Sequence, residues 1–455
     1  MSAPIQKTIG LLVGDELDWP DVMELLAEQM GPTVHYDGKT YEVNFRRLRI
    51  DPFSLRDPSK YDVVIDRLAY WHFTPREWLK KAALVNRTYL LNNPFTFQAM
   101  EKHSAYCAMI RLGLDIPETW LIPQKQGPEA YREKFLRTAA RYHDLFDLPA
   151  IGAEIGYPLF MKPFDGGGWR DVTKIDDVRA LMRAYDASGQ TLMHLQQGLI
   201  DYDVFCRSLA VGPQVTNLRF APEKPQHARY VIDHGFLSPE EGDQVRIITK
   251  LINAFFRWDF NSCETIHKDG KVWPIDFANA CPDIAVNSLH YYFPWAIKAL
   301  YSWAVFCAVS ERPMRIALDP EPYFEVADSE RSYSEKLTAY EALADAHFRR
   351  EAFEAFRGDE LARLDSVMWD LVGSDGFDQV LRQTVEGVFP PHEQSGFYHH
   401  FKGLLGHWQQ SHEDVWGPPK PEGAEEAEAE ATEAAPAEAA PAEAEPAEVE
   451  DAQAD

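Results

Sequence analysis

The sequence predicts an α+β protein, and three observations along the chain lead to this prediction. The first 95 residues alternate apolar, β-branched runs with helical stretches, which is typical of a parallel α/β unit. Residues 192–232 hold four closely spaced strand patterns, as in an antiparallel sheet. Residues 330–410 are helical and carry many aromatic side chains.

The N-terminal unit is expected to contain four strands and two helices. The strand patterns are residues 8–13, 40–50, 61–65 and 88–91, and the helical patterns are residues 21–30 and 74–85. The last strand stops at Asn92-Asn93-Pro94, where proline cannot continue a ladder of hydrogen bonds.

The middle of the chain mixes both element types. Helices are predicted at residues 96–112, 128–146 and 239–256, and strands at 118–122, 158–162, 192–197, 205–211, 215–220 and 228–232. Pro128 suits the first position of its helix, where a missing N–H costs nothing. Residues 263–266 and 272–277 form a predicted hairpin around Lys268-Asp269-Gly270, because Asp-Gly is a strong turn signal.

Charge is unevenly distributed along the 455 residues. The chain has 72 acidic and 45 basic residues, a net charge of −27, but the stretch 421–455 alone holds 13 acidic residues and no lysine or arginine. This Ala-, Glu- and Pro-rich segment has little to bury, so a disordered tail is expected from residue 416 onward. The rest of the chain, residues 1–420, has a net charge of −14. This acidic balance argues against nucleic acid and anionic membranes as partners, since both require a basic face.

The five cysteines form no Cys-x-x-Cys pair, which fits a reducing compartment in which each is a small buried hydrophobe. No secretory signal is visible. The most apolar stretch, residues 293–309, is short and contains Lys298 and Ser302, so it predicts a buried amphipathic helix and not a membrane span. A soluble, cytoplasmic protein is expected.

A lysine and a glycine cluster stand at the end of the strand predicted at 158–162. Lys162 ends an apolar run and is followed at once by Gly166, Gly167 and Gly168. Glycine lets backbone N–H groups approach phosphate oxygens, and such a loop can close as a lid. The alternative is a tight turn beside a lysine whose amine reaches solvent.

Three oxygen-bearing side chains lie on and beyond the arms of the predicted hairpin. Glu264 is six residues before Gly270 and Asp276 six after it, so the two carboxylates are expected to lie close across the ladder, with Asn279 just beyond. Carboxylates side by side repel unless a cation lies between them, and Mg²⁺ prefers such ligands together with phosphate oxygens. Two solvated strand acids are the alternative.

Together these motifs resemble the ATP-grasp superfamily over about residues 60–290, in the right order throughout. The closest branches are the ribosomal-protein glutamate ligases and the glutathione synthetases. Lys102, eight residues after Pro94, and Lys162 are similar to the family's two nucleotide lysines, and Gly166–Gly168 to its phosphate loop. Leu195-Gln-Gln-Gly-Leu199 resembles the hinge where Gln197 and Leu199 would meet adenine.

The resemblance also implies roles for three arginines and a metal site. Arg207, in Arg207-Ser-Leu-Ala-Val-Gly212, and Arg229 would act on the transferred phosphate, and Arg67 would lie near the substrate. Glu264, Asp276 and Asn279 would bind two Mg²⁺ ions. The family usually has Glu-x-Asn where this chain has two residues between Asp276 and Asn279, so Asp283 is an alternative third ligand. The link 124–155 is also longer than usual, and Trp169 replaces a small residue.

The domains that follow are a pre-grasp unit (1–95), an ATP-grasp domain (96–315, with lobes 96–195 and 196–315), a helical region (316–415) and the tail (416–455). The implied activity is ADP-forming ligation of a small-molecule or peptide carboxylate to an amine (or thiol) through an acyl phosphate, with ATP and Mg²⁺. A homo-oligomer is possible. An ATP-binding protein without ligase activity and a grasp-fold phosphotransferase are the alternatives, although no histidine stands out for the latter.

Overall fold

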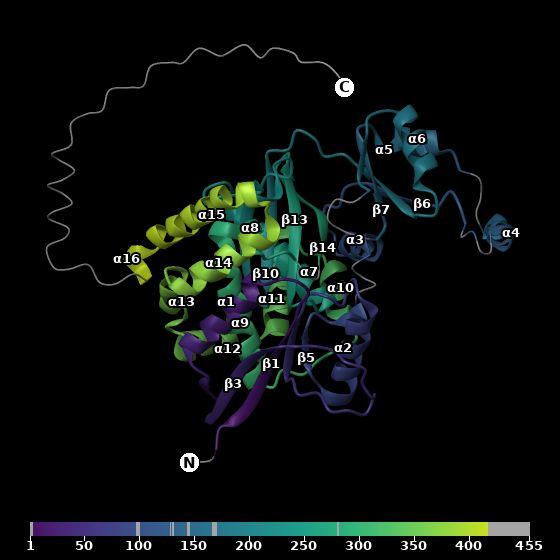
Figure 1. Ribbon diagram of the computed structural model, residues 1–455. Helices are drawn as coiled ribbons and strands as arrows, with labels where there is room; N and C mark the ends of the chain where they lie inside the picture. The colour runs from purple at the N-terminus through teal and green to yellow at the C-terminus, as the bar shows by residue number, and fades with distance from the viewer. Residues whose placement is uncertain are drawn as a thin grey trace, which may run out of the picture.

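The computed structural model describes residues 3–96, 101–127, 129, 132–142, 146–165, 171–279 and 282–416. It confirms the α+β class, with three sheets, a helical C-terminal extension and a small lobe that stands out from the rest of the chain (Figure 1). The predicted tail lies outside the described residues from 417 onward.

The N-terminal sheet has five strands in the order β2-β3-β1-β4-β5. Its elements are β1 (Ile5–Leu12), α1 (Asp18–Met30), β2 (Thr33–Tyr36), β3 (Lys39–Arg47), β4 (Val63–Asp66), α2 (Phe73–Asn86) and β5 (Tyr89–Leu91). Strand β1 runs parallel to β3 and β4, and β4 parallel to β5, as the alternation predicts. The antiparallel edge strand β2 was not predicted, although Asp37-Gly38, both with positive φ, form the two-residue turn that joins it to β3.

The small lobe is built on a four-stranded antiparallel sheet of order β6-β9-β7-β8. Its elements are β6 (Thr119–Ile122), α4 (Arg132–Tyr142), α5 (Leu148–Ile155), β7 (Leu159–Pro163), β8 (Thr173–Ile175), α6 (Val178–Ser188) and β9 (Met193–Gln197). The preceding helix α3 (Lys102–Arg111) packs instead into the core of the rest of the chain. Helices α5 and α6 cover one face, and Leu148, Leu159, Leu181 and Leu195 belong to a core separate from that of the rest of the chain.

The third sheet is antiparallel, in the order β12-β11-β10-β13-β14. It consists of β10 (Val204–Val211), β11 (Gln214–Phe220), β12 (Tyr230–Val231), β13 (Phe260–Lys268) and β14 (Lys271–Asn279). The short η3 (Gln226–Ala228) connects β11 to β12, and α7 (Pro239–Phe256) connects β12 to β13. Helix α7 matches the predicted bounds, and a Ser238–Glu241 capping box and an N-terminal proline explain where it begins. It packs across β10, β11, β13 and β14.

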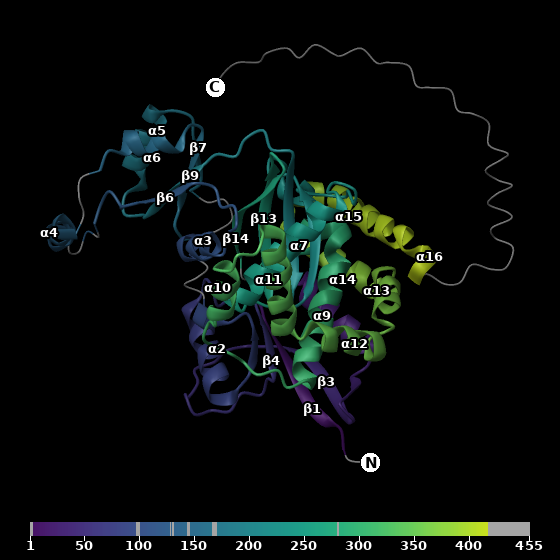
Figure 2. The ribbon, with the colours of Figure 1, turned by 180° about the vertical axis from the view of Figure 1, so that it is seen from behind.

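The rest of the chain is helical. It comprises α8 (Val286–Leu289), η4 (His290–Tyr292), α9 (Phe293–Val309), α10 (Glu321–Ala327), α11 (Tyr333–Phe348), α12 (Arg350–Glu360), α13 (Leu364–Val372), α14 (Asp375–Val388), α15 (Pro391–Ser411) and α16 (Glu413–Trp416). Seen from behind, α11 lies beside α7 (Figure 2). These helices share one core with the N-terminal and third sheets.

Helix α9 corrects one prediction in part. Its bounds are as expected, but it is buried around nearly its whole circumference instead of being amphipathic, because β1, β10, α1, α12 and α13 surround it. No helix in the described part of the chain is long and apolar enough to cross a bilayer. A second correction concerns Cys107, which is exposed, whereas Cys206, Cys263 and Cys307 are buried as predicted.

The β10–β11 turn depends on a glycine. Gly212 has a left-handed φ of 56°, and a Cβ there would lie 2.4 Å from the Trp303 ring. We expect Gly212→Ala to lower the free energy of unfolding by about 2–4 kcal/mol, because backbone strain and overpacking add. Urea denaturation measures this. Gly270→Ala is the matched control: its φ is 70° but no atom lies within 4 Å, so it should cost only about 1 kcal/mol. Equal losses of unfolding free energy in the two variants would contradict the argument that contact with the Trp303 ring adds to the cost at Gly212.

Candidate functional site

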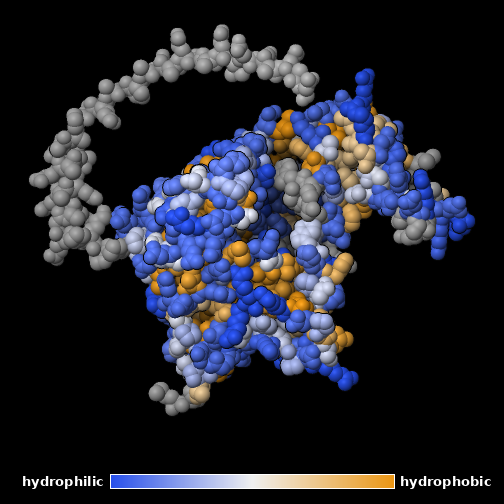
Figure 3. Space-filling view, viewed as in Figure 1, coloured by the Kyte–Doolittle hydropathy of each residue, from blue (hydrophilic) through white to orange (hydrophobic). Residues whose placement is uncertain are grey.

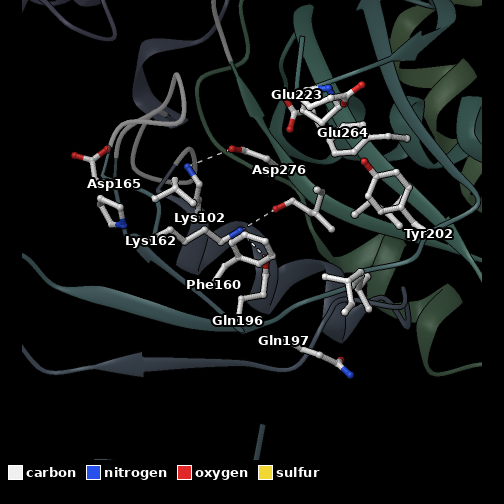
Figure 4. Close-up of a pocket in the computed structure, with 18 residues that line it drawn as sticks. Lys102, Phe160, Lys162, Asp165, Gln196, Gln197, Tyr202, Glu223, Glu264 and Asp276 are labelled. Atoms are coloured by element: carbon white, nitrogen blue, oxygen red, sulfur yellow. Dashed lines mark hydrogen bonds and ion pairs between the residues drawn. The ribbon is translucent and has the colours of Figure 1, made fainter. Parts of the chain in front are cut away.

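A cavity of about 340 Å³ lies between the small lobe and the third sheet, where the space-filling view shows a hollow (Figure 3). Both antiparallel sheets contribute to its wall. The wall is made in part of apolar and in part of charged side chains, and Figure 4 labels the charged ones. The apolar part includes Phe160, Val172, Leu199, Ile200, Phe205, Ile266 and Ile275, and the charged part Lys102, Lys162, Asp165, Glu223, Glu264 and Asp276.

Lys162 lies near the end of β7 and is 7% exposed. Its amine donates to Gln196 Oε1 at 2.6 Å, Tyr106 Oη at 2.9 Å and Ile275 O at 3.3 Å, so it bridges the two sheets (Figure 4). Burial lowers its pKa to about 8, although Asp276 and Glu264 oppose the shift. The lysine is therefore mostly protonated at neutral pH, whereas burial and the Lys162 charge lower the pKa of its cross-strand partner His194 to about 3.

Lys102 begins α3 and reaches the same region from another element. Its backbone N–H donates to Phe164 O at 3.0 Å, which fixes the helix start against the end of β7. Its amine lies 3.5 Å from Asp276 Oδ2, as the dashed line in Figure 4 shows. The two predicted lysines are thus brought to one cavity by a helix that packs on β14 and by a strand of the small lobe.

Glu264 and Asp276 are direct partners across the β13–β14 ladder, which confirms their predicted proximity. Glu264 is 8% exposed, and its Oε1 lies 3.5 Å from Arg207 Nη1 on the neighbouring strand β10. Burial raises the pKa of Glu264; Arg207 opposes that shift, and the charge of Asp276 adds to it. The pair is a concentrated negative charge facing the two lysines.

Asn279 lies on the same side of the sheet as this pair because the ladder is irregular. Ser262 pairs with Asn279 and Glu264 with Asp276, so two residues of β14, Phe277 and Ala278, stand opposite one residue of β13. The bulge offsets the extra residue that separates Asp276 from Asn279 in the sequence. The Asn279 amide donates to Ser262 Oγ at 3.0 Å, and Arg207 Nη2 donates to the same oxygen at 3.2 Å.

Asp283, the alternative third ligand, is engaged elsewhere. Its carboxylate accepts from Gln226 Nε2 at 3.0 Å and from the backbone N–H of Ala285 at 2.9 Å. Within the described residues, no group of three His, Cys, Asp or Glu side chains is arranged to hold a metal ion. Two facing carboxylates and an amide nevertheless suit Mg²⁺, which takes one or two carboxylates and completes its shell with phosphate and water.

The predicted hinge residues Gln197 and Leu199 both line the cavity. Between them, Gly198 donates to Pro158 O at 3.1 Å, and a Cβ on Gly198 would lie 2.4 Å from that oxygen. The chain that follows β9 is therefore held against the residue that precedes β7, at the point where it leaves the small lobe. The glycine loop, Gly166–Gly168, lies outside the described residues.

None of the three predicted arginines lines the cavity, although Arg207 contacts the wall residue Glu264. Arg229 donates to Lys224 O at 2.9 Å in the β11–β12 connection. Arg67, after β4, lies 3.1 Å from Glu16 Oε1 and donates to Pro282 O at 2.7 Å, so the N-terminal sheet meets the chain just past Asn279. The C-terminal helix α15 borders the same region, since Phe397 packs edge-on against His227 at 4.8 Å.

Several residues of the site were not predicted from the sequence: Tyr106, which bonds to Lys162 but does not itself line the cavity, and the wall residues Gln196, Glu223 and Tyr202. Tyr106 follows Lys102 by four residues and therefore shares its helix face, a spacing that could have identified it. Gln196 stands next to the predicted Gln197. Glu223 and Tyr202 lie in loops with no motif, so no local signal marks them.

Comparison with known proteins gives structural similarities alone. No known protein family matches the chain, and no curated protein matches it. Among solved structures, it is similar to a RimK domain protein ATP-grasp from Sphaerobacter thermophilus (14% identity, 66% of this chain and 99% of that one, TM-score 0.44). It is also similar to D-alanine–D-alanine ligase from Bacillus anthracis complexed with ATP (14% identity, 67% of this chain and 97% of that one, TM-score 0.42). A third similar structure is N5-carboxyaminoimidazole ribonucleotide synthetase from Thermotoga maritima (14% identity, 69% of this chain and 78% of that one, TM-score 0.43).

Proposed function

We propose that this chain is an ATP-grasp ligase that joins a carboxylate to an amine (or thiol) with formation of ADP. The observation that supports this most is the cavity between the two antiparallel sheets. Its apolar part suits a base, and its charged part combines two buried lysines with two facing carboxylates, which suits a triphosphate with a metal ion.

In this proposal Lys102 and Lys162 bind the phosphates of ATP, together with the loop Gly166–Gly168. Gln197 and the backbone near Leu199 contact adenine. Gln196 and Tyr106 position the Lys162 amine, since both bond to it directly. Phosphoryl transfer depends mainly on alignment and charge neutralisation, which are what these fixed groups supply.

Glu264, Asp276 and Asn279 would hold Mg²⁺, with two ions expected. When bound, Mg²⁺ would neutralise the triphosphate charge beside the two carboxylates. In the structure, ion pairs such as that between Lys102 and Asp276, at 3.5 Å, offset part of the negative charge of the two carboxylates.

The proposed reaction has two steps. A substrate carboxylate oxygen attacks the γ-phosphorus, and the bond between that phosphorus and the bridging oxygen breaks, which yields ADP and an acyl phosphate. The amine then attacks the acyl carbon, and inorganic phosphate and a proton leave. Arg207, held beside Glu264 and Ser262, is the cation we assign to the acyl phosphate, with Arg229 also assigned to phosphate and Arg67 to the substrate.

The domain organisation proposed with this function is a pre-grasp unit (1–95), the ATP-grasp lobes (96–195 and 196–315), the helical region (316–415) and the tail (416–455). The substrates would then enter where β4, the end of β14 and α15 meet, because Arg67 contacts Pro282 there and Phe397 contacts His227.

A second candidate is an ATP-binding protein without ligase activity. The placement of Arg229 favours it, because this guanidinium contacts the carbonyl of Lys224 and does not line the cavity. Both candidates require ATP binding, so the capture of an acyl phosphate separates them.

The test is to incubate the protein with MgATP, pooled amino acids and small carboxylates, and hydroxylamine. We expect a hydroxamate and ADP in equal amounts, because hydroxylamine intercepts acyl phosphates. Asp276→Asn in the same incubation is the control for contaminating ligases and should give neither product. ATP binding without ADP from pools that cover amino acids, peptides and dicarboxylates would favour the second candidate.

A further inference from the structure

A second cavity, of about 140 Å³, lies away from the nucleotide cavity and shares no lining residue with it. Four separate parts of the chain form its wall: β5, the connection between α7 and β13, the loop after α9, and the joint between α11 and α12. One of these parts, the joint between α11 and α12, belongs to the helical region 316–415, for which the proposed ligase chemistry assigns no ligand.

The cavity collects four arginines: Arg257, Arg312, Arg315 and Arg349. Arg257 ends α7 and Arg349 joins α11 to α12, both with left-handed φ, and the other two come from the loop after α9. Residues distant in the sequence therefore bring their guanidinium groups to one small space.

None of these arginines forms a close ion pair with a carboxylate in the described part of the chain, although the charge of Asp259 acts on Arg312 and that of Asp319 on Arg257. Within the described part of the chain, their hydrogen-bond partners are uncharged: Arg257 donates to Ala317 O, Arg349 to Tyr36 Oη, and Arg312 to Tyr89 Oη and His347 O. Arg312 is 8% exposed, yet these bonds use only two of its five N–H groups. Burial and the neighbouring Arg315 lower the pKa of Arg257, which shows that the cations repel one another.

Two further groups of the wall fit an anion. Asp259 is the one acid among the wall residues, and its carboxylate already accepts from Tyr89 Oη and Trp303 Nε1, so one negative charge stands against four positive ones. His347 Nε2 is buried without a partner among the described residues. Burial and Arg312 lower the pKa of His347 to about 3, so the ring is neutral and can offer a hydrogen bond.

We propose that this cavity binds a phosphate group, either as free inorganic phosphate or as the phosphoryl group of a small metabolite. A tetrahedral dianion offers several acceptor oxygens to N–H groups that converge from different sides, and guanidinium groups bind phosphate with charge-assisted, often paired hydrogen bonds. The small volume excludes a nucleotide as a fully enclosed ligand. This site does not depend on the proposed ligase function.

The test measures inorganic phosphate binding to the full chain by calorimetry at constant ionic strength. Arg315→Gln and Arg349→Gln change exposed side chains, so the fold should be retained, and each should weaken phosphate binding about tenfold through loss of one charge-assisted bond. Arg331→Gln removes the same charge from an exposed position outside the cavity and should change the affinity less than twofold.

Two further arms assign the site and the source of the phosphate. Lys162→Ala should leave phosphate binding at this site unchanged, which separates it from the nucleotide cavity. Glycerol phosphate that binds more tightly than inorganic phosphate would identify a metabolite phosphoryl group, and the reverse order would identify free phosphate. Absence of binding to the parent at millimolar phosphate, or equal affinity in the Arg315→Gln/Arg349→Gln double variant, would overturn the proposal.

Discussion

Lys162→Ala should weaken MgATP binding at least about 100-fold. The amine is buried between the two sheets and is one of the two buried cations of the cavity, so its loss removes a charge-assisted contact worth about 3 kcal/mol. Titration of MgATP with fluorescence or calorimetric detection measures the effect.

The matched control is Lys174→Ala, in the neighbouring strand β8. Lys174 has a side chain that is 51% exposed and lies 3.1 Å from Asp176, so removing it should leave MgATP affinity within about twofold. Because Lys162→Ala also leaves an empty space where the lysine stem packed, Lys162→Met, which keeps most of that volume, should be measured beside it, and unfolding curves would show whether either variant lost its fold. Parent-like affinity in both folded Lys162 variants would place the nucleotide elsewhere.

The hairpin shows how far the sequence alone could define the site. Symmetry about Gly270 predicted that Glu264 faces Asp276, and the structure agrees. Near the turn, however, Lys268 pairs with Lys271, and an unbroken ladder would therefore place Glu264 opposite Ile275. A register shift between Thr265 and Glu264, beside Pro274 on the edge strand, restores the predicted pairing.

For Asn279, the spacing in the sequence argued against the face of the sheet on which the structure places it. Two intervening residues put its role as a ligand in doubt, because side chains alternate between faces along a regular strand. A second shift, between Glu264 and Ser262, returns it to the face of Asp276. Neither bulge follows from local sequence, since each depends on how β14 aligns with β13. Loop residues such as Glu223 were missed for the same reason: their positions are set by tertiary packing.

Asp276→Asn should reverse the metal dependence of ATP binding. Glu264 and Asp276 place two carboxylates beside the expected triphosphate, so without metal they repel it and with Mg²⁺ they bind it through the ion. Removing one charge should therefore strengthen ATP binding in EDTA severalfold and weaken MgATP binding about 10- to 100-fold. The ratio of the two dissociation constants is the measurement, and it does not require the ligase substrates.

Asp269→Asn is the control, because this aspartate lies in the exposed turn of the same hairpin and makes the same change of charge. The ratio of the dissociation constants for ATP in EDTA and with Mg²⁺ should be the same in this variant as in the parent. Asn279→Ala should lose part of the Mg²⁺ effect, whereas Asn279→Asp should retain it, since the bulge keeps a ligand oxygen on the face of Asp276. If Asp276→Asn weakened ATP binding equally with Mg²⁺ and with EDTA, the carboxylate would be a structural partner of Lys102 and not a metal ligand.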